Sequence, residues 1–315
     1  MASSHAIYQF ADLRIASSIA MPELTRVRRT PRSRPWQFVI LSAPYPGPEA
    51  SWFHEWLDPD GRRWLRIGRH GNSYLLRFER FAAFVIDLEQ STIACHREPG
   101  TPLATVRHLL LNQVLPLLPG GRNRLVLHAA AVRMAGGAIG LVGRGGAGKS
   151  TLCAALRTLG CGLVTDDALV VARRNGRFVV SPSYGAIRLW PDALHTLGES
   201  ANGAMPVAHY TSKLRAVDVM FDRHATPLER LYILAAPDTD TVAVSVRRLG
   251  ARDAAAALLP STFFLDIESR FLLASAFETL ASVAEQIPVF TLAYPWDLRR
   301  LRQSADQLLA AIRAA

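Results

Sequence analysis

The stretch LVGRGGAGKS, residues 141–150, decides the fold, because it has the spacing G-x-x-x-x-G-K-S of a phosphate-binding P-loop. An apolar run over residues 136–142 predicts a buried strand before it, and residues 150–159 carry apolar side chains at helical spacing up to Gly160. This order wraps successive backbone N–H groups around an anion at a helix N-terminus, whose dipole favours negative charge. The sequence therefore predicts a binding site for a nucleoside triphosphate or a close relative.

The residues of this loop have separate predicted tasks. Its glycines let the backbone approach a phosphate without an intervening Cβ. Lys149 is expected to reach the β- and γ-phosphates, and the Ser150 hydroxyl to hold Mg²⁺. The predicted nucleotide-binding residues are Gly143, Arg144, Gly145, Gly146, Ala147, Gly148, Lys149, Ser150 and Thr151.

Two adjacent acids follow on the next apolar run, residues 162–171. Asp166 lies sixteen residues beyond Ser150, and Asp167 comes directly after it. A P-loop site needs a carboxylate near its metal, commonly at the end of a neighbouring strand. Adjacent strand residues point to opposite faces, so both acids can reach the loop only if the strand ends or bends there. We expect one acid to accept a proton from an attacking hydroxyl and the other to orient metal or water. The alternative is a strand-end pair that makes only turn hydrogen bonds.

Composition bounds the class of protein. The chain has 315 residues, half of them hydrophobic, which is enough for a sizeable core and for two domains. It has no apolar run near the roughly 18 residues of a membrane span, and residues 1–10 lack the form of a signal peptide. Cys95, Cys153 and Cys161 have neither disulfide-framework nor metal-site spacing. These features predict a cytoplasmic protein that has no membrane partner.

The net charge of +10 is carried mainly by arginine and is spread along the chain. Residues 26–34 are its densest part, and there a solvated basic loop is favoured over an arm that docks an anion or a partner. Because the sequence has no stripe of interleaved basic and aromatic residues, nucleic acid is not an expected partner.

The pattern predicts a mixed α/β protein of two domains. Residues 1–102 alternate short β-rich runs with turns and are expected to form a smaller antiparallel β-unit. Its aromatic residues could line a peptide groove, although core packing is favoured. Residues 103–315 form the predicted P-loop domain, which opens with an amphipathic helix over 103–118. Residues 199–215 are polar and rich in Gly and Pro, so we expect a mobile loop.

Three features together resemble a known family. His128 lies fifteen residues before Gly143, the P-loop follows, and a V-x-D-D strand ends at Asp167. In this order and spacing they resemble the C-terminal kinase domain of HPr kinase/phosphorylase. The likeness is closer to the small HPr-kinase-like proteins of ribosomal peptide pathways, notably lasso peptides, and it covers roughly residues 124–215. The shared segments are residues 15–24, residues 188–194, a basic position like Lys213, and residues 288–292.

The resemblance implies phosphoryl transfer from ATP, with Mg²⁺, to a serine of a peptide or small protein. It implies that Asp166 is the base, that Asp167 is its partner and shares the metal with Ser150, and that His128 and Lys149 lie near the transferred group. Apart from the resemblance, the residues we expect to bind the acceptor are Arg188, Lys213 and Arg215, with an extended peptide laid along the segment of the last two.

The sequence also departs from the family in two ways. The family's metal-binding Glu has no clear equivalent, since residues 181–185 occupy its region, and the long phosphorylase signature is absent. Neither phosphorolysis nor HPr itself as acceptor is therefore implied. Two other readings stay open: a small-molecule kinase related to phosphoenolpyruvate carboxykinases, and a nucleotide-sensing regulator with little turnover. The oligomeric state also stays open.

Overall fold

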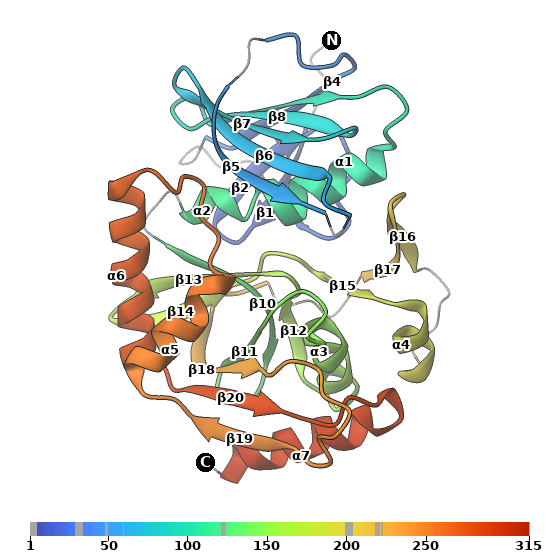
Figure 1. Ribbon diagram of the computed structural model, residues 1–315, viewed down its shortest axis with the longest axis vertical. Coiled ribbons are helices and arrows are strands. Elements are labelled where there is room, and N and C mark those ends of the chain that lie inside the picture. Colours follow the sequence, from blue (N-terminus) through green and yellow to red (C-terminus); the bar gives the residue numbers. More distant parts are fainter. Residues whose placement is uncertain are drawn as a thin grey trace.

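A computed structural model describes residues 5–28, 34–47, 50–58, 60–120, 124–198, 204–217, 221 and 223–314. It has an N-terminal unit, rich in β-strands, from the first third of the chain, and a second unit of mixed helices and strands that carries the P-loop (Figure 1). The predicted mixed α/β class is confirmed. Part of the basic segment at 26–34, residues 29–33, lies outside the described residues.

The N-terminal unit is a nine-stranded sheet with the order β3-β1-β2-β4-β9-β8-β7-β6-β5. Its strands are β1 (Ala6–Phe10), β2 (Leu13–Ser17), β3 (Thr25–Val27), β4 (Trp36–Leu41), β5 (Ser51–Leu57), β6 (Arg63–His70), β7 (Ser73–Phe78), β8 (Ala82–Asp87) and β9 (Thr92–Arg97). The expectation of a purely antiparallel unit is wrong at β4, which runs parallel to both β2 and β9. The reason is the path of the chain, because β3 pairs on the far side of β1 before β4 returns beside β2.

The predicted helix over 103–118 forms as three segments in succession. These are α1 (Leu103–Leu109), the π-helical turn η1 (Leu110–Val114) and α2 (Leu117–Gly120). Its apolar face packs on the N-terminal sheet, in one buried cluster that also contains Val126 and Val170 of the second unit. One continuous core therefore joins the two units and fixes this helix between them.

The second unit is built on an eight-stranded sheet. Its strands are β10 (Leu125–Arg133), β11 (Ala138–Val142), β12 (Gly162–Thr165), β13 (Ala168–Arg174), β14 (Arg177–Ser181), β18 (Thr226–Leu234), β19 (Ser245–Arg248) and β20 (Val289–Ala293). Strand β18 pairs in parallel with β11 on one side and with β20 on the other. The carboxyl ends of these three strands therefore meet at one edge, where ligands bind in open α/β sheets.

Helices cover the P-loop strand β11 on both faces. Ile139 and Leu141 are buried in the cluster that includes α3 (Lys149–Thr158) and α7 (Leu301–Ala314). Ala138 and Val142 point into the opposite cluster, with α5 (Ala251–Leu258) and α6 (Arg270–Gln286). Burial on both faces explains why this strand is a continuous apolar run rather than an alternating one.

A small three-stranded sheet beside the P-loop contains β15 (Ala186–Leu189), β16 (Met205–Ala208) and β17 (Thr211–Val217), and α4 (Pro191–Thr196) follows β15. The predicted mobile loop over 199–215 is thus wrong for residues 205–215, which form a hairpin, and residues 199–203 lie outside the described part. The hairpin is held by distant segments that the sequence pattern does not reveal. Its strand β17 pairs with β15, and the Tyr210 ring at its tip packs against Trp64 and Phe81.

No helix in the described ranges is both long enough and apolar enough to cross a membrane.

Candidate nucleotide-binding site

The predicted strand, glycine loop and helix are present, with the loop between Val142 at the end of β11 and Lys149 at the start of α3. Gly146 and Gly148 adopt left-handed backbone angles, with φ of 82° and 85°. An L side chain is strained there, which explains glycine at both positions. Gly148 is also the N-cap of α3, so the loop delivers free backbone N–H groups to the end of the helix.

Lys149 lies over the loop. Its Nζ donates to the carbonyl oxygens of Gly143, at 2.7 Å, and Arg144, at 3.0 Å. Burial lowers the pKa of Lys149 to about 8, although the charges of Asp167 and Asp166 act in the opposite direction. The ammonium is therefore held at the mouth of the loop, with weak carbonyl partners that a phosphate could replace.

Asp166 lies behind the loop and is fully enclosed. Its Oδ1 accepts a hydrogen bond of 2.6 Å from the Ser150 hydroxyl, and its Oδ2 accepts one of 3.0 Å from the backbone N–H of Arg188. A hydroxyl and a carboxylate in contact are the oxygen ligands that Mg²⁺ prefers, with its remaining positions taken by water and phosphate oxygens. The described residues contain no cluster of three or more His, Cys, Asp or Glu side chains that could hold a metal by itself. The Ser150–Asp166 pair thus fits Mg²⁺ bound together with a nucleotide.

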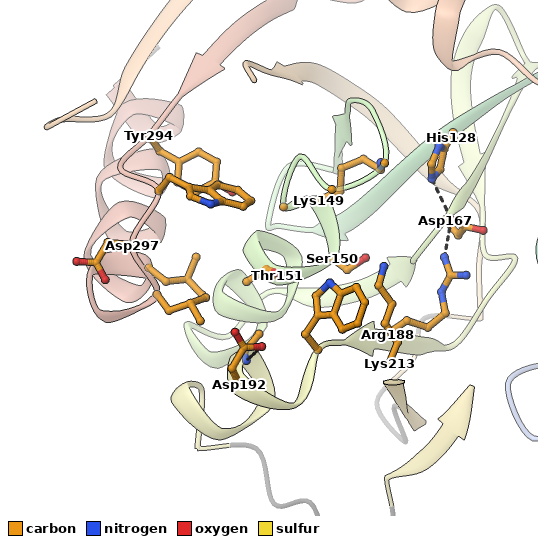
Figure 2. A pocket seen from close by; sticks show the side chains of 18 of the residues that line it. His128, Lys149, Ser150, Thr151, Asp167, Arg188, Asp192, Lys213, Tyr294 and Asp297 are labelled. Carbon is orange, nitrogen blue, oxygen red and sulfur yellow. Dashed lines mark hydrogen bonds and ion pairs between the residues drawn. The ribbon is translucent and has the colours of Figure 1, made fainter. Parts of the chain in front are cut away.

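Asp167 reaches the cavity because the strand stops before it. Strand β12 ends at Thr165, and Asp167 has a φ of 102°, which a residue with a side chain rarely adopts. Its carboxylate pairs with the Arg188 guanidinium at 2.5 Å and with His128 Nε2 at 3.1 Å (Figure 2). Burial alone would raise the pKa of Asp167, but Arg188 and His128 outweigh it and hold the pKa well below its usual range. Asp167 is therefore ionised at neutral pH.

A cavity of about 430 Å³ opens over the loop. Its polar end holds His128, Asp167, Arg188 and Lys213, while Tyr294 lies at the far end and the loop runs between (Figure 2). The residues that line it are Gln113, His128, Gly145, Gly146, Gly148, Lys149, Ser150, Thr151, Asp167, Arg188, Trp190, Asp192, Ala193, Lys213, Tyr294, Pro295, Trp296, Asp297, Leu298 and Leu301.

Two basic residues complete the polar end. The Arg188 guanidinium is enclosed between the two acids, with Asp167 as its close partner and Asp166 Oδ2 3.8 Å from its Nε. Lys213, on β17, has its Nζ 5.2 Å from the centre of the Trp190 ring. Burial, and then the charge of Arg188, lowers the pKa of Lys213. Arg188, Lys213 and Lys149 thus place three basic side chains around the ionised Asp167 carboxylate.

The structure brings most of the sequence-predicted residues to this cavity. Gly143, Arg144 and Ala147 of the loop do not line it, Asp166 lies behind the loop, and Arg215 points elsewhere. Arg215 lies on β17 with Lys213, but its guanidinium is buried against Glu23 in the N-terminal unit. Arg107 also pairs with Glu23, at 3.2 Å. Arg215 is therefore placed to tie the hairpin to the N-terminal unit rather than to line the cavity.

Sequence reasoning missed the aromatic segment at residues 294–297 and the helix residue Gln113. The segment follows β20, which runs parallel to β18 and hence to β11, so its first residues emerge at the edge where the P-loop lies. An apolar strand followed by Tyr-Pro-Trp-Asp indicates residues at the edge of the P-loop site once that parallel strand order is known. Gln113 reaches the cavity from the π-helical turn η1, for which the sequence offers no signal.

No protein-family model matches the chain, and no curated protein matches it either. Among solved structures, the chain is similar to the Hpr(Ser) kinase/phosphatase from Coxiella burnetii. The identity is 16%, the match covers 60% of this chain and 96% of that chain, and the TM-score is 0.33.

Proposed function

We propose that this protein is an ATP-dependent phosphotransferase that moves the γ-phosphoryl group to a hydroxyl, in the first place a serine of a peptide or small protein. One juxtaposition carries the proposal: a phosphate-binding loop, the Ser150–Asp166 pair and the ionised Asp167 all adjoin one cavity. These are the parts that phosphoryl transfer requires, namely a cradle, a metal site and a group that receives a proton.

The two acids have different roles in this proposal. Asp166, bonded to Ser150 behind the loop, is the metal-side acid, and Mg²⁺ bound there would neutralise charge on the phosphate oxygens. Asp167 lines the cavity and is the base. This assignment reverses the roles that the family resemblance implies for the pair, because Asp166 is covered by Ser150 and the Arg188 backbone while Asp167 faces the space for an acceptor.

Asp167 can act as the base despite its low pKa. The acceptor hydroxyl becomes strongly acidic only as its oxygen bonds to phosphorus, and a weak base then suffices to take its proton. The transition state for this reaction is loose, so the proton leaves late. Before that, the carboxylate orients the hydroxyl by accepting its hydrogen bond, while His128 and Arg188 hold the carboxylate in place. Lys149 and Lys213 stabilise negative charge on the transferred group.

The nature of the acceptor rests on the family resemblance and on the charges in the cavity. Bidentate recognition of a carboxylate-bearing metabolite favours free arginines, but Arg188 is the one arginine among the described lining residues and Asp167 already pairs with it. A neutral hydroxyl on a peptide fits this end better. A small-molecule kinase and a nucleotide-sensing regulator are the alternatives that the experiment below separates.

The test is transfer of label from γ-labelled ATP to serine-containing peptides, with Asp167→Asn as the key variant. Loss of a positioned base should slow labelling about 10²–10⁴-fold, whereas ATP binding by the variant should persist. Asp253→Asn makes the same change at an exposed position of helix α5 and should label at the normal rate. Labelling by Asp167→Asn at the wild-type rate would remove Asp167 as the base. Label in a metabolite instead of a peptide would select the small-molecule kinase, and tight ATP binding without any transfer would select the regulator.

A further inference from the structure

The far end of the cavity is walled by two aromatic side chains that the phosphoryl-transfer chemistry does not use. Tyr294 and Trp296 have ring centres 6.3 Å apart and planes inclined by 50°. Trp296 is 42% exposed although it lies in a cavity wall. A half-exposed indole in the wall of a cavity beside a phosphate loop is a surface on which an aromatic base can stack.

This aromatic pair rests directly on the loop. A Cβ added at Gly148 would lie 2.3 Å from the Tyr294 hydroxyl and 2.8 Å from the Trp296 ring. The pair therefore flanks the N-terminus of α3, beside the loop residues that bind phosphate. Leu298 and Leu301 also line the cavity.

The position of Asp167 sets the direction of a bound nucleotide. The transferred phosphoryl group must face Asp167, which lies at the polar end with His128 (Figure 2). A linear triphosphate laid over the loop from that end directs its nucleoside the other way. The nucleoside then arrives at the end where Tyr294 lies.

We propose that Tyr294 and Trp296 form the nucleobase subsite, in which the base of a nucleoside triphosphate stacks on the exposed face of Trp296. The inference rests on the proposed function, because the direction of the nucleotide follows from Asp167 as the base. Trp190 is the competing platform in the same cavity, and it is 48% exposed. Its ring already carries the Lys213 ammonium at 5.2 Å, and the charge of Arg188 acts on that lysine at the polar end.

The experiment compares ATP with inorganic tripolyphosphate, which has the phosphates but no base. Base stacking on an aromatic side chain contributes about 1–3 kcal/mol, so Trp296→Ala should weaken ATP binding about 5- to 150-fold. Tripolyphosphate binding should be unchanged in the same variant, and Trp296→Phe, which keeps a ring, should retain most of the ATP affinity. Trp56→Ala is the matched control, because Trp56 on β5 is 43% exposed and lies outside the cavity. It should change neither affinity.

Several outcomes would overturn the inference. Undiminished ATP affinity in Trp296→Ala would show that the base lies elsewhere, and equal loss of ATP and tripolyphosphate would show that Trp296 only supports the loop. Selective loss of ATP in Trp190→Ala, with Trp296→Ala normal, would place the base at the polar end. If the wild-type protein bound neither ligand, the proposed function would fail together with the subsite. Failure confined to the tryptophan variants would remove the subsite alone.

Discussion

The substitution Gly148→Ala tests whether the aromatic pair rests on the phosphate loop, and Gly146→Ala is its internal control. The two glycines share the same left-handed backbone, with φ of 85° and 82°. They differ in surroundings, since a Cβ at Gly148 would overlap Tyr294 and Trp296, whereas a Cβ at Gly146 would meet nothing within 4 Å. Alanine in this conformation costs about 1–2 kcal/mol at either site. Overpacking adds about 1–3 kcal/mol at Gly148 alone, which gives a total of about 2–5 kcal/mol.

The assay is urea unfolding followed by fluorescence and circular dichroism, with the free energy of unfolding compared between the two alanine variants. The nearest atom to the new methyl group is the Tyr294 hydroxyl. Tyr294→Phe removes that atom, so it should restore part of the stability lost in Gly148→Ala and none of that lost in Gly146→Ala. Equal destabilisation by the two alanines, or no recovery with Tyr294→Phe, would refute the placement of the aromatic pair.

Two further predictions concern buried ionisable side chains outside the cavity. Arg215→Met removes one cationic partner of the buried Glu23 carboxylate and leaves Arg107, at 3.2 Å. It should therefore lower the free energy of unfolding by about 3 kcal/mol without changing the KM for the acceptor. A raised KM with normal stability would contradict this. His108 lies beside the amide of Asn112, and burial lowers its pKa to about 3. The unfolded state therefore binds the His108 proton more tightly than the folded state does. The free energy of unfolding should fall as the pH drops from 6.5 toward 3, by at most about 1.4 kcal/mol per pH unit. Unfolding free energies measured across this range should show a smaller slope in His108→Gln, and equal slopes would contradict the prediction.

The sequence predicts the centre of the P-loop unit well because the signals there are local. The helix expected over 150–159 is α3, at Lys149–Thr158, and the strand expected over 136–142 is β11, at Ala138–Val142. Glycines that need left-handed angles and apolar residues at a fixed period specify these elements without help from distant contacts. The sequence does not specify which acid meets Ser150, and the family resemblance favours Asp167 there, whereas Asp166 makes the bond. That outcome depends on the pairing of β12 and β11 with β10, which no local pattern specifies.

The cavity walls depend on contacts between distant segments, and local patterns do not carry them. Tyr294 lies beside Gly148 only because β18 separates β11 from β20 with all three strands parallel, an order that no local pattern specifies. The hairpin that carries Lys213 reads as a polar loop, since its strand character comes from pairing with β15. Tertiary context thus overrides propensity at the places where the site is completed.

The break between Asp166 and Asp167 is what allows two neighbouring residues to serve one site. In a continuous strand their side chains would lie on opposite faces, and one would be lost to the core. Here β12 stops at Thr165, and the left-handed backbone of Asp167, with a φ of 102°, swings its carboxylate to the cavity while Asp166 remains bonded to Ser150. A non-glycine residue in this conformation costs about 1–3 kcal/mol and persists only where its surroundings hold it. Arg188 and His128 supply that restraint through the Asp167 carboxylate, so the same two contacts hold the strained backbone and keep the proposed base ionised.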